Sequence, residues 1–315
     1  SHDRSFAPAL EMTGSLFAAG WEAGTVEARI AEPASGGFET CGCPMCSGQG
    51  TIGGEAGLGE DDAPGAPGSL QTLANYLRVG FWTDTGRSSR WFNMTNSGTG
   101  ANGETLHYNY TGWTGTQNGY SDSNGVGTAS HRTMIDDAFD FYGALLGINF
   151  VRTTDTADYV DFYIGDFNTT SAFNSAVVHS GTGGAIDFNV LNVAAGWGNG
   201  SGGTWNGYIY QTWLHEIGHA LGLGHQGNYN AGSGSPTYAT SAIWENDSWA
   251  LSMMSYWSQT TNTSSSTQDY SYAEVITPMM ADLIALNDLY AWQGNGIANS
   301  YLGNTIYGVG TNITN

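Results

Sequence analysis

Lysine is absent from this 315-residue chain, and only seven arginines oppose 28 acidic residues, which gives a formal net charge of −21. Such an acidic chain repels nucleic acid and anionic membranes, so we expect neither as a partner. No apolar run is long enough to span a bilayer, and the opening residues SHDRSFAPAL do not form a signal peptide. The acidic composition suits an extracellular, saline or calcium-rich setting. If the protein is exported, its signal was removed or lies outside this sequence.

Cysteine is nearly absent as well. The three cysteines, Cys41, Cys43 and Cys46, fall within six residues of one another. The rest of the chain therefore has no disulfide framework, and its stability must come from a core and from bound metals. Apolar residues make up 40% of the chain and aromatic residues 13%, so a packed globule is expected.

Composition divides the chain into three parts. Residues 1–70 are rich in glycine and acidic residues and end in a Pro/Gly stretch, which predicts an extension and linker. From residue 71 aromatic and aliphatic residues become dense, and we predict one domain over 71–292. Residues 293–315 resemble the beginning of a further element.

Helical periodicity predicts three helices. The first covers 130–146, with Ser130 as N-cap and a buried face of Ile135, Ala138, Phe139, Tyr142 and Leu146. The second covers 208–222. The third begins at Thr277 and Pro278 and runs to about residue 290.

Three short strands are predicted between the first two helices. In the segment YVDFYIGDF, Val160, Phe162 and Ile164 alternate with Tyr159, Asp161 and Tyr163. NSAVVHS and AIDFNVL form two more strands, separated by GTGG. Helices and strands in this order predict an α+β domain.

The segment HEIGHALGLGH, residues 215–225, contains three of the seven histidines. Positions i and i+4 share one face of a helix, so His215 and His219 can bind one ion. Gly222 can adopt a backbone conformation that other residues resist, which allows the chain to bring His225 back as a third ligand. A lone HExxH pair arises by chance, but Gly222 and His225 at these offsets favour a metal site.

Three neutral imidazoles leave one tetrahedral position open on a zinc ion, which is the pattern of a catalytic site. Zinc lowers the pKa of bound water into the neutral range. Glu216 lies next to the first ligand and can act as the general base and then the general acid.

A second motif, ALSMMSYW at residues 250–257, supports a family resemblance. Together with HEIGHALGLGHQGNYNAG it resembles the serralysin-like metzincin zinc metalloproteases of the M10 type, which Gram-negative bacteria secrete. The resemblance implies that Met254 forms the Met-turn beneath the ligands. It also implies that Tyr256 can bind the zinc and move to stabilise the oxyanion. Met254 as ordinary core filling is the alternative.

The family also implies a fold. Its domain has a twisted, mostly parallel sheet with an antiparallel edge strand, an active-site helix and a C-terminal helix, and here an irregular N-terminal extension and the start of a β-roll would flank it. NSAVVHS would be the edge strand, with His179 as a strand residue rather than a ligand. Calcium is expected from the family, at sites that the sequence does not assign. His2, His107 and His131 have no ligand spacing and are expected to be solvated or locally bonded.

The chain departs from the family in three ways. Gln226 follows the third histidine, where many relatives carry proline, and we expect a small effect. The glycine-aspartate repeats of the β-roll are absent, and the N-terminal extension contains cysteines.

The cysteine cluster has several interpretations. A structural zinc knuckle needs four ligands, and the chain has only three cysteines. A redox CPMC pair is expected within a βαβ unit, which this part of the sequence does not show. CGCP at 41–44 resembles the cysteine switch of matrix metalloproteinase pro-segments, without the flanking arginine and aspartate. Cys41 would then bind the zinc as an inhibitory thiolate. A local disulfide without a zinc role is the alternative, and Cys43 and Cys46 could pair in either case.

The sequence therefore predicts a secreted, extracellular bacterial zinc endopeptidase that attacks polypeptides with zinc-bound water. It would be a zymogen, inhibited by its own pro-segment. The alternatives are a non-catalytic metzincin-fold binding or surface protein, which Glu216 argues against, and a zinc amidase of cell-wall peptides, which the Met-turn disfavours.

Overall fold

The computed structural model describes residues 65–94, 105–154, 160–168, 171–179, 184–197, 205, 207–229, 236–261 and 270–301. They all lie in one compact unit, Phe38–Asn315, and none lies in the other, Ser1–Gly37. Most of the predicted extension and residues 302–315 of the predicted β-roll region fall outside them. The predicted domain boundaries therefore stay predictions. None of the described helices is long and apolar enough to cross a membrane.

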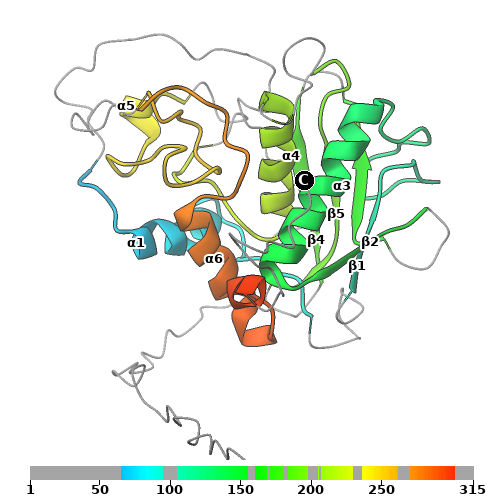
Figure 1. Ribbon diagram of the computed structural model, residues 1–315, viewed down its shortest axis with the longest axis horizontal. Helices are drawn as coiled ribbons and strands as arrows, with labels where there is room; N and C mark the ends of the chain where they lie inside the picture. The colour runs from blue at the N-terminus through cyan, green and yellow to red at the C-terminus, as the bar shows by residue number, and fades with distance from the viewer. Residues whose placement is uncertain are drawn as a thin grey trace, which may run out of the picture. The chain divides into compact units, whose positions relative to one another are not determined.

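A five-stranded sheet forms one layer of this unit (Figure 1). The strand order is β2-β1-β3-β5-β4, and every neighbouring pair is parallel except β4 with β5. The strands are β1 (Thr105–Asn109), β2 (Asn149–Arg152), β3 (Phe162–Gly165), β4 (Phe173–Val178) and β5 (Ile186–Asn192). This confirms the predicted mixed architecture, with a mostly parallel sheet and one antiparallel edge strand.

Helices α3 (Ala129–Leu146) and α4 (Tyr208–Ala220) cover one face of the sheet (Figure 1). The apolar stripe predicted for α3 is confirmed, because all five of its residues are buried. The predicted cap is wrong: Ser130 lies in the first turn, and Thr128 is the N-cap residue. Gly147, with φ +71°, ends the helix in the left-handed conformation that glycine adopts at low cost.

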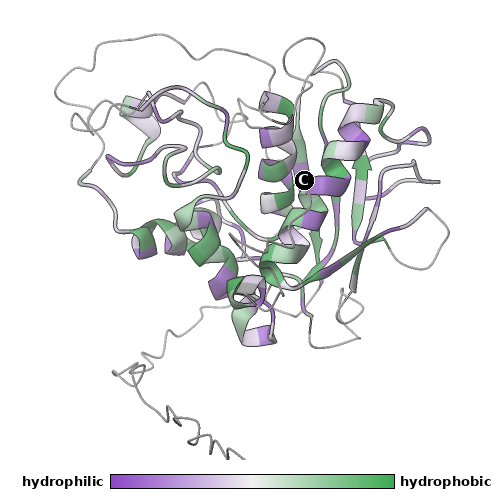
Figure 2. Cartoon of the chain, in the orientation of Figure 1, coloured by the Kyte–Doolittle hydropathy of each residue, from purple (hydrophilic) through white to green (hydrophobic). Residues whose placement is uncertain are grey.

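The core includes buried apolar residues of these two helices and of the sheet. Figure 2 shows hydrophobic residues along these elements in green. Phe139 of α3 packs against Phe150 and Phe162 at ring-centroid distances of 5.1 Å. The predicted alternation in β3 holds for Phe162 and Ile164, but Asp161 is also buried. Its carboxylate accepts the backbone N–H of His107 at 2.6 Å, which offsets part of the cost of burial.

The C-terminal helix α6 covers Met280–Tyr290. Its predicted start at Thr277 and Pro278 is wrong by two residues. The N-cap is Met279, because the carboxylate of Asp282 accepts the N–H of Met279 at 2.8 Å and so closes the first turn. Two 3₁₀ turns follow, η5 (Ala291–Gln293) and η6 (Ile297–Tyr301), and a short helix α5 (Tyr238–Ser241) precedes the Met-turn.

The sequence did not predict the first helical segment. It consists of α1 (Leu70–Asn75), the π-helical turn η2 (Tyr76–Gly80) and α2 (Phe81–Asp84). Ser69 caps α1, since its hydroxyl accepts the N–H of Thr72. The segment lies beside α6, and Gln71 donates to Asp288 across the contact (Figure 1). Strands β1 and β2 were also missed; β2 is largely exposed and has no buried alternation.

Candidate metal centre

Helix α4 carries the first two histidines of the motif, and both are buried. His215 and His219 are one turn apart, so their rings lie on the same face with centroids 4.6 Å apart. From Ile209 to Ala220 every residue of this helix is buried. A rigid, fully enclosed helix therefore positions two of the three predicted ligands.

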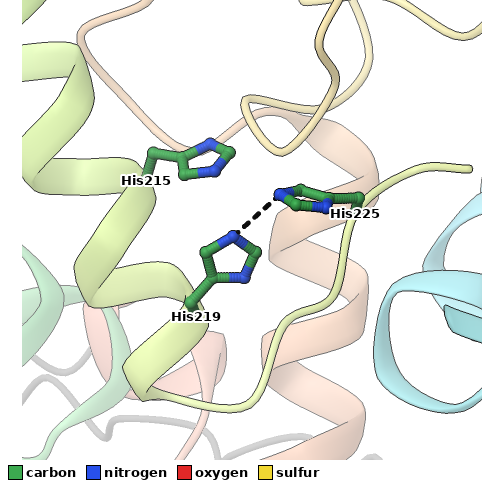
Figure 3. Close-up of side chains that lie close together, drawn as sticks. All are labelled: His215, His219 and His225. Carbon is green, nitrogen blue, oxygen red and sulfur yellow. Dashed lines mark hydrogen bonds between the residues drawn. The ribbon is translucent and has the colours of Figure 1, made fainter. Parts of the chain in front are cut away.

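Gly222 turns the chain out of the helix with φ +109°. A Cβ built on this residue would lie 2.2 Å from the carbonyl oxygen of Arg90, so no other residue fits there without displacing backbone. After this turn the chain doubles back, and His225 approaches the helix (Figure 3). Its ring centroid lies 4.6 Å from that of His219 and 5.5 Å from that of His215. This confirms the prediction that Gly222 adopts a backbone conformation that other residues resist.

Each histidine uses its Nδ1 atom to bond a backbone carbonyl. His215 bonds Met253 at 3.0 Å, His219 bonds Leu223 at 2.7 Å and His225 bonds Tyr229 at 2.9 Å. A neutral imidazole that donates from Nδ1 carries a lone pair on Nε2. Carbonyl partners of this kind orient metal-binding histidines and fix their tautomer.

The three rings offer their other nitrogens to one point. Their potential ligand atoms lie within 4.8 Å of one another, and the Nε2 atoms of His219 and His225 are 3.0 Å apart (Figure 3). With both Nδ1 hydrogens directed to carbonyls, two lone pairs face each other, an arrangement that a cation stabilises. Among the described residues no other group of three His, Cys, Asp or Glu side chains is placed to hold a metal. The donor set fits a zinc ion.

The electrostatic surroundings favour neutral imidazoles. Burial holds the pKa of His219 well below its usual value, and the positive charge that His215 and His225 would carry lowers it further. A neutral imidazole is the form that binds a metal, so the site is ready for an ion at neutral pH.

Two further predicted residues lie close to the histidines. Glu216 follows His215 on α4 and is fully buried. Tyr256 is also buried, and its ring centroid lies 4.6 Å from that of His225. Glu216 is therefore a buried sequence neighbour of His215, and the Tyr256 ring packs against the His225 ring. Their catalytic roles stay predictions. Cys41 lies outside the described residues, so its predicted zinc contact is not tested.

Met254 lies where the Met-turn is expected. A Cβ on Gly218 would lie 3.0 Å from the Met254 sulfur and 2.9 Å from the terminal methyl of Met253. The turn therefore packs directly against α4, in the space left by the missing side chain of Gly218. This contact involves α4 between its two histidines, and Met254 is at the same time fully buried in the apolar core. The Met-turn role therefore stays a prediction.

Asp282 of α6 anchors the Met-turn, a role that the sequence did not reveal. Its carboxylate accepts the hydroxyl of Ser252 at 2.6 Å and the N–H of Met253 at 2.8 Å. Because the carbonyl of Met253 accepts from His215, the chain of bonds runs from α6 to the first ligand. In the sequence Asp282 is an acidic residue in the first turn of a helix, which is a common capping position and gives no sign of a partner in the Met-turn.

Tyr229 and Asp247 form a second buried support that sequence reasoning missed. The Tyr229 hydroxyl donates to the Asp247 carboxylate, with oxygen–oxygen distances of 3.0 and 3.1 Å, and accepts the N–H of Tyr256 at 3.4 Å. Burial raises the pKa of Asp247 to about 7. The pair links the third ligand, through the Tyr229 carbonyl, to the Met-turn.

Of the remaining histidines of the described residues, His131 and His179 are locally hydrogen-bonded, whereas His107 only lies near a carboxylate. His179 bonds Asp187 at 2.8 Å, His107 lies 3.7 Å from Asp161, and His131 bonds the Trp197 carbonyl at 2.9 Å. None of the three is near the metal-binding group. His2 lies outside the described residues.

The sequence around this site is similar to known peptidases. Residues 155–276 match the profile of the Peptidase M66 family. The curated relatives include a metallopeptidase AprA of Pseudomonas marginalis, 40% identical over 107 residues, which cover 34% of this chain and 21% of that protein. A serralysin C of Dickeya chrysanthemi is 39% identical over 105 residues, with 33% and 20% covered.

A longer match reaches a serralysin of Photorhabdus laumondii, 33% identical over 174 residues, or 52% of this chain and 33% of that protein. The chain thus spans between a fifth and a third of the length of these relatives. Metalloproteases of this kind imply a zinc ion, and the structure contains a group of three histidines that could hold a metal. The predicted resemblance is therefore confirmed. This chain is serralysin-like and is similar to zinc metalloendopeptidases.

Proposed function

We propose that this chain contains the catalytic domain of a zinc-dependent endopeptidase that hydrolyses polypeptides. The observation that carries the proposal is the convergence of His215, His219 and His225 on one buried point, with the buried Glu216 next to His215 in the sequence. The match to the Peptidase M66 profile, over residues 155–276, covers the same residues. These residues would hold zinc, and Glu216 would be left to move protons.

Zinc, when bound, supplies a Lewis acid that lowers the pKa of water and polarises a carbonyl. Glu216 takes a proton from the attacking water and delivers it to the leaving amine. Tyr256 directs its hydroxyl to the oxygen on which negative charge develops. The buried carbonyls of Met253, Leu223 and Tyr229 keep the three imidazoles neutral and oriented throughout.

Strand β4 supports a polypeptide as the substrate. It is the edge of the sheet on the α4 side, and it runs antiparallel to β5. An extended substrate can pair with the outer edge of β4 through main-chain hydrogen bonds, whatever its sequence. Side-chain pockets beside this edge would then set the preference among substrates.

Replacing Glu216 with glutamine tests the catalytic role. The amide keeps the shape of the side chain but cannot take up the proton, so we expect kcat on casein to fall by about 10²- to 10⁴-fold. Zinc content should stay at one ion per chain. Glu274→Gln is the matched control, because Glu274 lies on the loop before α6 and its carboxylate bonds only Tyr272 in the described contacts. Full activity of E216Q would contradict the assignment.

The rival function is a binding or surface protein that keeps this frame without catalysis. An assay on casein or gelatin, with and without a chelator, separates the two. Chelator-sensitive hydrolysis by the wild-type chain supports the enzyme, and inert zinc-saturated protein supports the rival.

We further propose that the protein is secreted by a bacterium as a zymogen and that the thiolate of Cys41 is an inhibitory zinc ligand. The support is the resemblance of CGCP to a cysteine switch and the acidic, lysine-free composition. Cys41→Ser should release activity in the full-length chain, whereas Cys43→Ser should not. Unchanged inhibition in C41S would exclude the thiolate. Calcium remains a family-based prediction without assigned residues.

A further inference from the structure

The loop that carries the third histidine, residues 222–226, lies along the helical segment 70–84. The two stretches are about 140 residues apart in the sequence. Three hydrogen bonds join them. The indole N–H of Trp82 donates to the Gly222 carbonyl at 3.0 Å, the N–H of Gly224 to the Leu77 carbonyl at 2.6 Å, and the Gln226 side-chain amide to the Leu73 carbonyl at 3.2 Å.

These bonds fall on alternate residues of the loop, as they do where an extended chain is bound along one side. The Trp82 side chain and Gln226 are buried, and Leu77 is fully buried. Hydrogen bonds in such surroundings are electrostatically stronger than bonds in water. The helical segment therefore holds the loop along its whole length.

The π-helical turn η2 provides the acceptor of one of these bonds. Within it the N–H of Phe81 bonds the carbonyl of Tyr76, five residues earlier, so one extra residue enters the turn. The Leu77 carbonyl accepts the N–H of Gly224 from the loop.

Phe81, at the start of α2, packs against two residues of the loop, His225 and Gly224. Its ring lies edge-on to the His225 ring with centroids 5.0 Å apart. A Cβ on Gly224 would lie only 2.3 Å from the Phe81 ring, so the loop and ring are in close contact.

The loop needs such support because of its own sequence. Gly222 and Gly224 give the loop more backbone freedom than any other pair of residues would. Fixing His225 in one position therefore costs more conformational entropy. Holding a ligand loop in its bound conformation before the ion arrives lowers the entropic cost of binding.

We propose that residues 70–84 are a positioning element for the metal centre and that Trp82 and Gln226 are its positioning residues. They act on the ion through the loop that carries His225. The proposal rests on the proposed zinc site. It assigns a function to Gln226, whose effect the sequence predicted to be small, and to a helical segment that the sequence did not predict.

Trp82→Phe tests the proposal, because it removes the indole N–H and keeps an aromatic ring in place. Full-length protein is stripped of metal, and its zinc dissociation constant is measured by competition with a chromophoric chelator at 20 °C. We expect zinc binding about tenfold weaker than in the wild type, the usual effect of losing an outer contact of a metal ligand. Gln226→Leu should act in the same direction. Trp292→Phe, at an exposed tryptophan of η5, is the matched control and should bind zinc as the wild type does.

His225→Ala calibrates the scale, since it removes the ligand itself. If His225→Ala leaves the wild-type zinc affinity unchanged, the proposed metal site fails, and the positioning role fails with it. If His225→Ala weakens binding but W82F and Q226L do not, only the positioning role is overturned. A lower melting temperature of the metal-free W82F protein with an unchanged dissociation constant would likewise show a purely structural contact.

Discussion

Gly222 and Gly86 share a left-handed backbone, but only Gly222 has close neighbours. The φ of Gly222 is +109° and that of Gly86 is +72°, and nothing lies within 4 Å of a Cβ built on Gly86. The two positions therefore separate the cost of backbone strain from the cost of a steric clash.

We expect Gly222→Ala to lower the free energy of unfolding by more than about 3 kcal/mol, because a methyl group would press on the Arg90 carbonyl. Gly86→Ala should cost only about 1 kcal/mol, for the left-handed backbone alone. Urea denaturation of the metal-free proteins measures both. If the two substitutions lowered the free energy of unfolding equally, the backbone near Arg90 would have moved to make room for the methyl group at residue 222.

Asp161 makes stability depend on pH. Burial raises its pKa to about 7, from 3.8 in an exposed carboxyl. Below pH 7 the folded protein holds this proton and the unfolded chain does not, down to about pH 4. The contribution of Asp161 to stability is therefore largest on the acid side and is lost as the pH rises through about 7.

Asp161→Asn should remove this dependence. The difference in pKa corresponds to at most about 4 kcal/mol. Thermal melts of wild type and D161N between pH 5 and pH 8.5 test the sign: the difference in stability should shift in favour of D161N as the pH rises. If the stabilities of wild type and D161N changed in parallel with pH, the predicted role of Asp161 would be wrong.

At the residue scale, the sequence predicted what is local. The ligand spacing, the turn at Gly222 and the neighbouring Glu216 all lie within eleven residues, and the helix period relates them. Asp247, Tyr229 and Asp282 were missed, because each is identified only by a partner that is distant in sequence or belongs to the backbone.

At the scale of elements, α6 and the Met-turn act as one unit. Asp282 has three hydrogen bonds to Ser252, Met253 and Met279, and burial raises its pKa to about 6. Its removal leaves the buried Ser252 hydroxyl, the buried N–H of Met253 and the part-buried N–H of Met279 without this acceptor.

Asp282→Ala should therefore lower the free energy of unfolding by about 3 to 5 kcal/mol. Asp282→Asn keeps one oxygen and the volume, and it should cost less than half as much. Chemical denaturation at pH 7.5 measures both, with Asp140→Asn on the exposed side of α3 as control. A D282A protein as stable as D140N would show that the Met-turn does not depend on this anchor.

Long, periodic elements were predictable, and short ones were not. Helix α3 was predicted to within one residue, since its apolar stripe repeats over four turns. Helix α1, the turn η2 and α2 have four to six residues each, too few to show a period, and tertiary contacts with α6 and the ligand loop stabilise them. The early start expected for α6 followed the Thr-Pro pair, which the Asp282 cap overrides.

At the scale of the whole molecule, the metal ion should contribute to stability. An ion that binds only the folded chain adds about 4 kcal/mol when its free concentration is a thousand times its dissociation constant. Chelation at pH 7.5 should lower the melting temperature, and added zinc should restore it. A melting temperature indifferent to chelator would contradict a bound ion.

The metal-free protein should also lose stability in acid. The unfolded chain protonates its histidines below about pH 6.5, whereas burial holds the pKa of His219 well below that value, so unfolding takes up protons. Melting of the metal-free protein at pH 7.5 and pH 5.5 measures the effect. His219→Ala should show a smaller loss between the two pH values.

The contacts of the ligand loop have a consequence for assembly. Two ligands come into register as soon as α4 forms, but the third depends on a hydrogen-bonded partner about 140 residues earlier and on a carbonyl of Tyr229 that Asp247 secures. A chain still emerging or partly unfolded can therefore offer an ion two imidazoles at most. Full coordination becomes a late event, available only when both ends of the fold have met.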